Sequence, residues 1–309
     1  MEIYLPIAGI PLPLLPLIGL GLSVGFLSGM FGVGGGFILT PIMIVMGVPP
    51  LVAVGTGACI VVASSVSGAL AHWSRGNVDA TMGSLLVVAG LVGSTVGSKL
   101  QLALKAMGQL EFFTTVTYAV ILTAIGSIML VEGGWAWLRV LRIATTVAPK
   151  KRRSRGINQR LPFRYRFRRS KMYISILPPL LVGSFVGFLT AVMGAGGGFI
   201  LIPLLVYVLG MNTRIAVGTS AFQVLFVAGY TTILQSQVNH NVDLMLGIPL
   251  ILGSVVAAQQ GVRVGSQLKP EQLRVLLGGL VLAVGIRMVV DVMTRPAELY
   301  SLASDTLHR

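Results

Sequence analysis

Ten apolar runs take up most of this 309-residue chain, and several of them approach or exceed the about 20 residues that a helix needs to cross a bilayer. Only 10% of the residues are charged, whereas a soluble domain carries roughly 25%. The runs are too long and too uniformly apolar for the alternating strands of a membrane barrel. The sequence therefore predicts an all-α, polytopic transmembrane bundle of about 8–10 spanning or half-spanning helices.

The expected helices form two groups of five on either side of a basic segment. The predicted runs are 14–30, 36–46, 51–73, 80–104 and 112–131, then 173–193, 198–209, 215–235, 243–264 and 273–293. We divide the chain into a first transmembrane repeat at 12–134, a basic cytoplasmic connector at 135–171, a second transmembrane repeat at 172–295 and a tail at 296–309.

Four motifs recur in the same order in both groups, which indicates an internal duplication. The segment GFLSGMFGVGGGFILTP from Gly25 matches GFLTAVMGAGGGFILIP from Gly187. The other three pairs are AVGT from Ala53 and Ala216, NVD from Asn77 and Asn241, and GSTVGSKL from Gly93 with GVRVGSQL from Gly261. Two duplicated halves that frame a central site are common among transporters.

The orientation of the two repeats depends on the short runs 36–46 and 198–209. At about 1.5 Å per residue, each reaches only about halfway across the bilayer core. Five crossings per repeat would invert the halves, whereas re-entrant short runs would leave four crossings and parallel halves. We favour inversion.

The two glycine triplets predict helix breaks inside the membrane. Glycine costs a helix about 1 kcal/mol relative to alanine, so three in a row favour an interruption. A short helix that starts after the break would point unpaired amides at an anion. The alternative is that these glycines only let helices pack closely. The candidate substrate ligands here are Gly34, Gly35, Gly36, Gly196, Gly197 and Gly198.

Hydroxyl and amide side chains near the second motif extend this candidate site. Thr56 and Thr219 occupy equivalent places in the two AVGT segments, and Ser220 and Gln223 follow in the second copy. Such groups donate hydrogen bonds to an oxyanion without a fixed charge. The alternative for each threonine is a hydrogen bond to its own helix. The Asp of each NVD segment precedes a long run, so we expect it to cap that helix.

Catalytic and metal-binding patterns are missing from the sequence. It contains no convincing Ser/His/Asp set, no paired intramembrane carboxylates and no nucleotide-binding glycine motif. The single cysteine, Cys59, can form neither an internal disulfide nor a cysteine cluster for zinc. We expect no enzymatic activity, no metal and no cofactor.

The net charge of +14 is concentrated in one place. Thirteen of the 23 Lys and Arg residues lie between Arg139 and Lys171, and that segment has no acidic residue. Basic loops mark the cytoplasmic side of a membrane protein, which is the reading we favour. Docking on anionic lipid is a second reading, and a nucleic-acid or protein partner is the least favoured.

The duplicated glycine-rich motifs, the VGT after each and the paired NVD segments resemble the sulfite exporter TauE/SafE family. The resemblance covers the chain apart from the connector and tail. It implies movement of small anions such as sulfite or organosulfonates across the bacterial inner membrane, with export as the default direction. It also implies a permeation site at the glycine motifs Gly32 to Gly36 and Gly194 to Gly198.

These observations together predict a secondary transporter that works by alternating access between the two repeats. An anion channel, or a membrane scaffold that uses the basic connector, are the alternatives. The expected partners are a small anionic substrate and the lipid bilayer, with anionic lipid at the connector as an option and no nucleic acid. Association into a homo-oligomer stays open.

Overall fold

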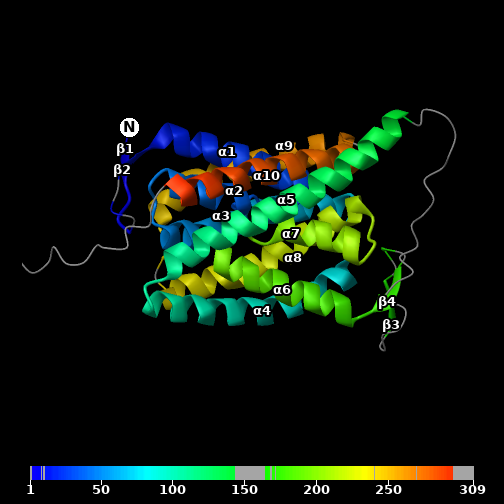
Figure 1. Cartoon of the computed structure of the whole chain (residues 1–309), viewed down its shortest axis with the longest axis horizontal. Helices are drawn as coiled ribbons and strands as arrows, with labels where there is room; N and C mark the ends of the chain where they lie inside the picture. Colours follow the sequence, from blue (N-terminus) through cyan, green and yellow to red (C-terminus); the bar gives the residue numbers. More distant parts are fainter. Residues whose placement is uncertain are drawn as a thin grey trace, which may run out of the picture.

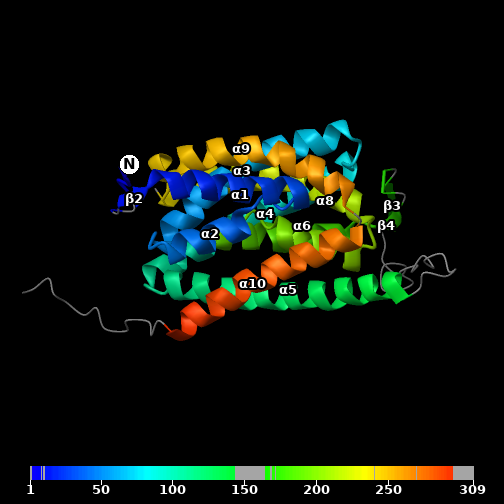
Figure 2. The ribbon, with the colours of Figure 1, turned by 90° about the horizontal axis from the view of Figure 1, so that it is seen from above.

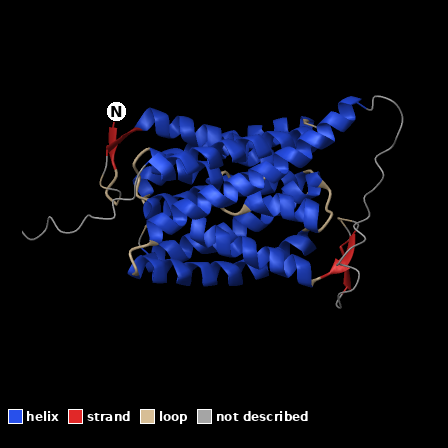
Figure 3. Cartoon of the chain, viewed as in Figure 1, coloured by secondary structure: helices blue, strands red, loops and turns tan. Residues whose placement is uncertain are grey.

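The computed structural model describes residues 2–7, 9, 11–142, 164–167, 169–170, 172–239, 241–268 and 270–294. Most of the predicted connector and the whole predicted tail lie outside the described residues. Figure 3 shows that the fold is helical apart from two small strand pairs. The helices are α1 (Leu14–Phe31), α2 (Gly36–Val45), α3 (Pro50–Ser74), α4 (Ala80–Ala106), α5 (Leu110–Arg142), α6 (Leu177–Met193), α7 (Gly198–Pro203), α8 (Thr213–Leu234), α9 (Leu244–Gln267) and α10 (Pro270–Thr294).

Short elements complete the described chain. A π-helical turn, η2 (Leu204–Val208), continues α7, and a second one, η3 (Gln235–Asn239), continues α8. Strands β1 (Glu2–Tyr4) and β2 (Pro11–Pro13) pair antiparallel before α1. Strands β3 (Arg164–Phe167) and β4 (Met172–Ser175) form a second hairpin before α6.

Two aspartates start long helices, as the sequence predicts. The Asp79 carboxylate accepts a hydrogen bond from the Met82 amide at 3.2 Å at the start of α4. The Asp243 carboxylate accepts from the amides of Met245 and Leu246 at the start of α9. A buried carboxylate at a helix N-terminus satisfies free amides and complements the helix dipole. The capping prediction is confirmed.

The outer faces of the helices are suited to lipid. On α4, Val88, Val92 and Val96 follow one another at four-residue spacing and are more than half exposed. The opposite face of α4 carries glycines that lie against α6 and α8. Six helices are long and apolar enough to cross a membrane. The protein is therefore a multi-pass membrane protein.

The two halves are interleaved, because the main helix packings join one half to the other. Helix α1 packs on α9, α6 packs on α4, α5 packs on α10 and α3 packs on α8. Figures 1 and 2 show these pairs side by side in two views, with α3 and α8 toward the middle of the bundle. The centre of the molecule is therefore built from both halves.

The direction of each helix follows from these contacts. Gly25 and Gly29 of α1 lie against Ser254 and Ala258 of α9, so α1 and α9 run parallel from the same end. In the other half, α6 runs parallel to α4, because Gly183 lies against Leu86 and Gly187 against Gly90. The sets α1, α3, α9 and α4, α6, α8 start at opposite ends (Figure 1).

Each half therefore consists of a helical hairpin and three crossing helices. Helix α1 enters from one end and α2 returns toward it, while α6 and α7 do the same from the other end. The halves run in opposite directions, as we favoured. However, the sequence argument that re-entrant short runs would give parallel halves is wrong. It counted α1 and α6 as full crossings, whereas each is the entering arm of a hairpin.

One of the four motif alignments is also displaced. A β-carbon at Gly97 would lie 2.6 Å from the carbonyl oxygen of Phe188, and one at Gly261 would lie 2.0 Å from that of Phe26. Phe26 and Phe188 are equivalent in the GFL motifs, so Gly97 rather than Gly93 is the counterpart of Gly261. The sequence alignment was wrong by four residues, about one helical turn, because both segments carry two glycines at four-residue spacing.

Several arginines lie together at one end of the bundle. Arg75, Arg169, Arg214 and Arg263 all lie at the end that carries the β3–β4 hairpin, which we call the connector end. Figure 1 places β1, β2 and the start of α1 at the opposite end. By the positive-inside rule, we expect the connector end to face the cytoplasm.

Candidate functional site

Both glycine motifs interrupt the helices, as predicted. Gly32, Gly34 and Gly35 have φ angles of 67°, 84° and 73°, and Gly194, Gly196 and Gly197 have 65°, 72° and 63°. These left-handed conformations are open to glycine at little cost and end α1 and α6. We call residues Gly32–Gly35 and Gly194–Gly197 the two glycine loops.

The glycine loops meet in the middle of the bundle. A β-carbon at Gly36 would lie 2.8 Å from the Cα of Ala195, and one at Gly198 would lie 2.4 Å from the carbonyl oxygen of Val33. The rings of Phe37 and Phe199 pack at a centroid distance of 5.3 Å. Any side chain at Gly36 or Gly198 would therefore separate the loops.

The start of α2 presents amides without internal partners. Its N-cap, Gly35, has no side chain to cap the helix. The Gly35 carbonyl accepts from the amides of Ile38 and Leu39. Within the described residues, no hydrogen bond is donated by the amides of Gly36 and Phe37. Free amides and the helix dipole together favour a negative charge at this position.

Two valines fill the space between the loops. Val61 lies at the middle of α3 and Val224 at the equivalent position of α8. A β-carbon at Gly34 would lie 2.8 Å from a Val61 methyl and 2.9 Å from a Val224 methyl. At Gly196 the corresponding distances are 2.5 Å and 3.1 Å. In this conformation the centre is closed by apolar side chains, and a substrate would have to displace them.

Three serines surround the first glycine loop, and sequence reasoning missed them. The Ser64 hydroxyl lies 3.2 Å from the Gly34 carbonyl oxygen and 3.3 Å from the Ser28 hydroxyl. The Ser65 hydroxyl is buried without a partner, 3.3 Å from where a Gly34 β-carbon would lie. The consecutive serines in the middle of an apolar run were the available signal.

Ser220 lies at the first loop, whereas the Gln223 amide lies against Gly90 of α4. The Ser220 hydroxyl donates to the carbonyl oxygens of Gly32 and Val217, both at 2.8 Å, which ties the first loop to α8. Gln223 is fully buried, and neither its amide nitrogen nor its carbonyl oxygen has a hydrogen-bond partner. An unpaired buried amide is costly, so Gln223 is suited to bind a polar ligand.

The two predicted threonines join the halves together. The Asp243 amide donates to the Thr56 hydroxyl at 3.0 Å, and the Asp79 amide donates to the Thr219 hydroxyl at 3.1 Å. Both hydroxyls are fully buried. Thr56 and Thr219 precede Val61 and Val224 by five residues, which is about 7.5 Å along a helix. Their chain neighbours reach the loops, because Ser220 bonds to Gly32 and Val54 lies against Gly194. Their role as ligands stays a prediction.

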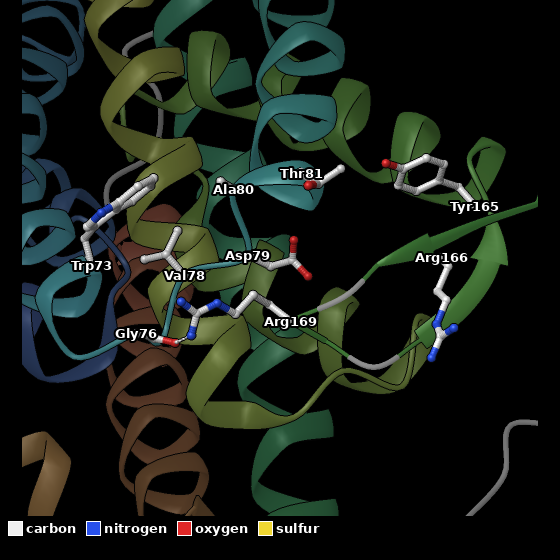
Figure 4. A pocket seen from close by; sticks show the side chains of 9 residues that line it. All are labelled: Trp73, Gly76, Val78, Asp79, Ala80, Thr81, Tyr165, Arg166 and Arg169. Carbon is white, nitrogen blue, oxygen red and sulfur yellow. Dashed lines mark hydrogen bonds between the residues drawn. The ribbon is translucent and has the colours of Figure 1, made fainter.

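A separate pocket of about 430 Å³ opens at the connector end. Figure 4 shows it between the start of α4 and the β3–β4 hairpin, with Arg166 and Arg169 among its lining residues. The Asp79 carboxylate in this pocket accepts hydrogen bonds from the Ser170 amide and hydroxyl. The hairpin is thus fastened to the same segment that Thr219 contacts.

Comparisons of the sequence with known proteins identify a family and several relatives. The family model described as "Sulfite exporter TauE/SafE" matches residues 17–288. The chain is 24% identical over 270 residues to "Probable membrane transporter protein YjnA" of Bacillus subtilis, covering 87% of this chain and 97% of the relative. It is 27% identical over 276 residues to a "Probable membrane transporter protein" of Xylella fastidiosa, covering 88% of this chain and 93% of the relative. No solved structure matches the chain significantly.

Proposed function

The chain belongs to the sulfite exporter TauE/SafE family of membrane transporters, and on that premise we propose that it is a secondary transporter of small oxyanions such as sulfite or an organosulfonate. Transport would run out of the cell, without chemical conversion of the substrate. The substrate would bind between the two halves, at the glycine loops.

One observation carries this proposal: two oppositely oriented hairpins meet at mid-depth with their glycine loops in contact. Irregular backbone at membrane depth is expected where it serves a substrate site. The free amides at the start of α2 and the unpaired Gln223 amide lie in this central region and suit an anion.

The acidic groups support an anion rather than a cation. Asp79 and Asp243 are buried, but both carboxylates are engaged with backbone amides at helix starts. Cation transporters usually place carboxylates on the ion path. The polar groups around the loops are instead neutral hydroxyls and amides.

The symmetry suggests how the protein would alternate between states. Val61 and Val224 close the centre from both halves. We propose that rocking of one hairpin relative to α3 and α8 withdraws these valines toward one end at a time. The site would then open first to one side of the membrane and then to the other.

The test is uptake of labelled sulfite, sulfoacetate and sulfate into inside-out vesicles and into proteoliposomes of purified protein. We expect saturable accumulation of at least one of these anions, with counterflow when the vesicles are preloaded. Flux no higher than in vesicles without the protein, from a preparation that unfolds cooperatively, would overturn the proposal. Single-channel currents without counterflow would instead favour the anion channel. Deleting residues 150–163 tests the scaffold alternative, because it leaves the β3–β4 hairpin in place and a transporter core keeps its flux without these residues.

A further inference from the structure

A line of buried polar side chains runs between α4 and α8, from the middle of the bundle to the end opposite the connector. We call it the polar seam, and its residues are Gln223, Ser94, Thr231, Ser98, Gln101 and Gln235. Each is at most 7% exposed. Helices α4 and α8 are in contact, with α6 beside them (Figure 1). At the inner end of the seam, the Gln223 amide lies against Gly90 of α4, and the next residue along α8 is Val224.

Hydrogen bonds close the outer end of the seam. The Gln235 amide donates to the Gln101 carbonyl oxygen, and the Asn241 amide lies 3.4 Å from the Gln235 carbonyl oxygen. Gln101 also donates to the Val192 carbonyl oxygen at 3.1 Å, near the end of α6. This closure consists of neutral hydrogen bonds, which an arriving polar solute can replace one by one.

The inner part of the seam is less well satisfied. The hydroxyls of Ser94 and Thr231 bond to each other at 2.7 Å. Gln223 on one side and the Ser98 hydroxyl on the other are buried without partners. Polar groups left unpaired inside a membrane helix bundle are costly, which makes a functional role the default explanation.

The chain contains its own control for this interpretation. The inverted half repeats the same helix packing between α9 and α3, with Gly261 in the place of Gly97. There, the positions equivalent to Gln223, Thr231, Ser94, Ser98 and Gln101 are occupied by Ile60, Gly68, Ala258, Val262 and Gly265, and the position of Gln235 is occupied by the buried His72. Five of the six seam positions therefore do not need a polar side chain for this packing.

We propose that the polar seam is the extracytoplasmic half of the path along which the oxyanion leaves the central site. This inference rests on the proposed function and adds the route. The lining supplies neutral amide and hydroxyl donors, which bind an oxyanion and release it again because no fixed charge holds it. The Gln101–Gln235–Asn241 hydrogen bonds form the outer gate.

Cysteine accessibility tests this route separately from transport. Cys59→Ala removes the native thiol, and single cysteines are then placed at Ser98 in the seam and at Leu250. Leu250 is a matched control. It is fully buried on α9, beside α1, and it lies on the same side of the bundle's middle as Ser98, toward the end opposite the connector. A membrane-impermeant anionic methanethiosulfonate is added from the extracytoplasmic side. We expect Ser98→Cys to react about tenfold faster than Leu250→Cys, with sulfite slowing the reaction.

Equal labelling rates at Ser98→Cys and Leu250→Cys would overturn the proposal that the polar seam is a path, whatever the flux of the wild-type protein. Absence of anion flux in the wild type would overturn the proposed function instead, since the labelling rates are measured without transport. A second variant, Gln223→Ile, installs the residue of the equivalent position. We expect it to keep its unfolding temperature and lose about tenfold in flux. Flux at the wild-type rate would contradict the seam.

Discussion

Val61 and Val224 occupy equivalent positions on α3 and α8, and both side chains touch both glycine loops. The contacts exist because Gly34 and Gly196 have no β-carbon, which would lie within about 3 Å of the valine methyls. The two valines, with Ala228 beside them, form a small apolar cluster of their own. This arrangement fills the space between the glycine loops at the place where the hairpins meet.

Truncating this closure should make the protein leak. We expect Val61→Ala and Val224→Ala to lower stability by about 1–3 kcal/mol, because buried methyl groups are lost. We also expect a several-fold rise in non-saturable sulfite flux, measured in proteoliposomes. Val182→Ala on α6 is the control, since Val182 is buried away from the loops. A leak no larger than that of Val182→Ala would contradict the role of the valines.

The absence of a side chain at Gly34 should be essential for both folding and flux. Gly34→Ala would place a methyl group against Val61 and Val224 at φ 84°, where an L-residue is strained by roughly 1–2 kcal/mol. We expect a lower unfolding temperature in detergent and loss of sulfite flux. Gly47→Ala is a matched control, because Gly47 has φ 93° but open space around it. If both variants transport equally well, packing at the first loop does not matter for function.

The sequence was a good guide to the helices and the breaks between them. Bilayer-length apolar runs, glycine triplets and the aspartates before α4 and α9 act through local rules, and each predicted the observed element. Side-chain contacts between distant helices were beyond its reach. In the sequence, Ser64 and Ser65 are ordinary residues of an apolar run. Only the fold shows that they lie beside Gly34 of the first glycine loop. The hydrogen bonds that the threonine hydroxyls accept were equally hidden, because their partner amides lie far away in the sequence.

Thr56 and Thr219 provide a test of structure against ligand binding. Thr56→Val and Thr219→Val would leave the buried amides of Asp243 and Asp79 unpaired, at a cost of about 1–3 kcal/mol. We expect lower unfolding temperatures, with a loss of flux no larger than the loss of folded protein. Thr232→Val is the control, because that hydroxyl bonds only within its own helix, to Ala228. If sulfite affinity falls while stability is unchanged, the threonines are substrate ligands after all.

The inverted arrangement predicts which parts of the chain face the cytoplasm. Helix α5 leads to the connector end, whereas α10 runs back and finishes at the opposite end (Figure 2). Arginines gather at the connector end, so this end should stay in the cytoplasm. A fluorescent protein inserted between residues 143 and 163 should therefore fluoresce, and alkaline phosphatase fused after Thr294 should be active in the periplasm. Sulfite flux of each fusion checks that it is folded. If both positions were cytoplasmic, the chain would have to cross the membrane an even number of times between residue 163 and Thr294. The structure does not allow this, because the hairpin of α6 and α7 does not cross and three crossing helices follow it. Such a result would contradict the inverted arrangement.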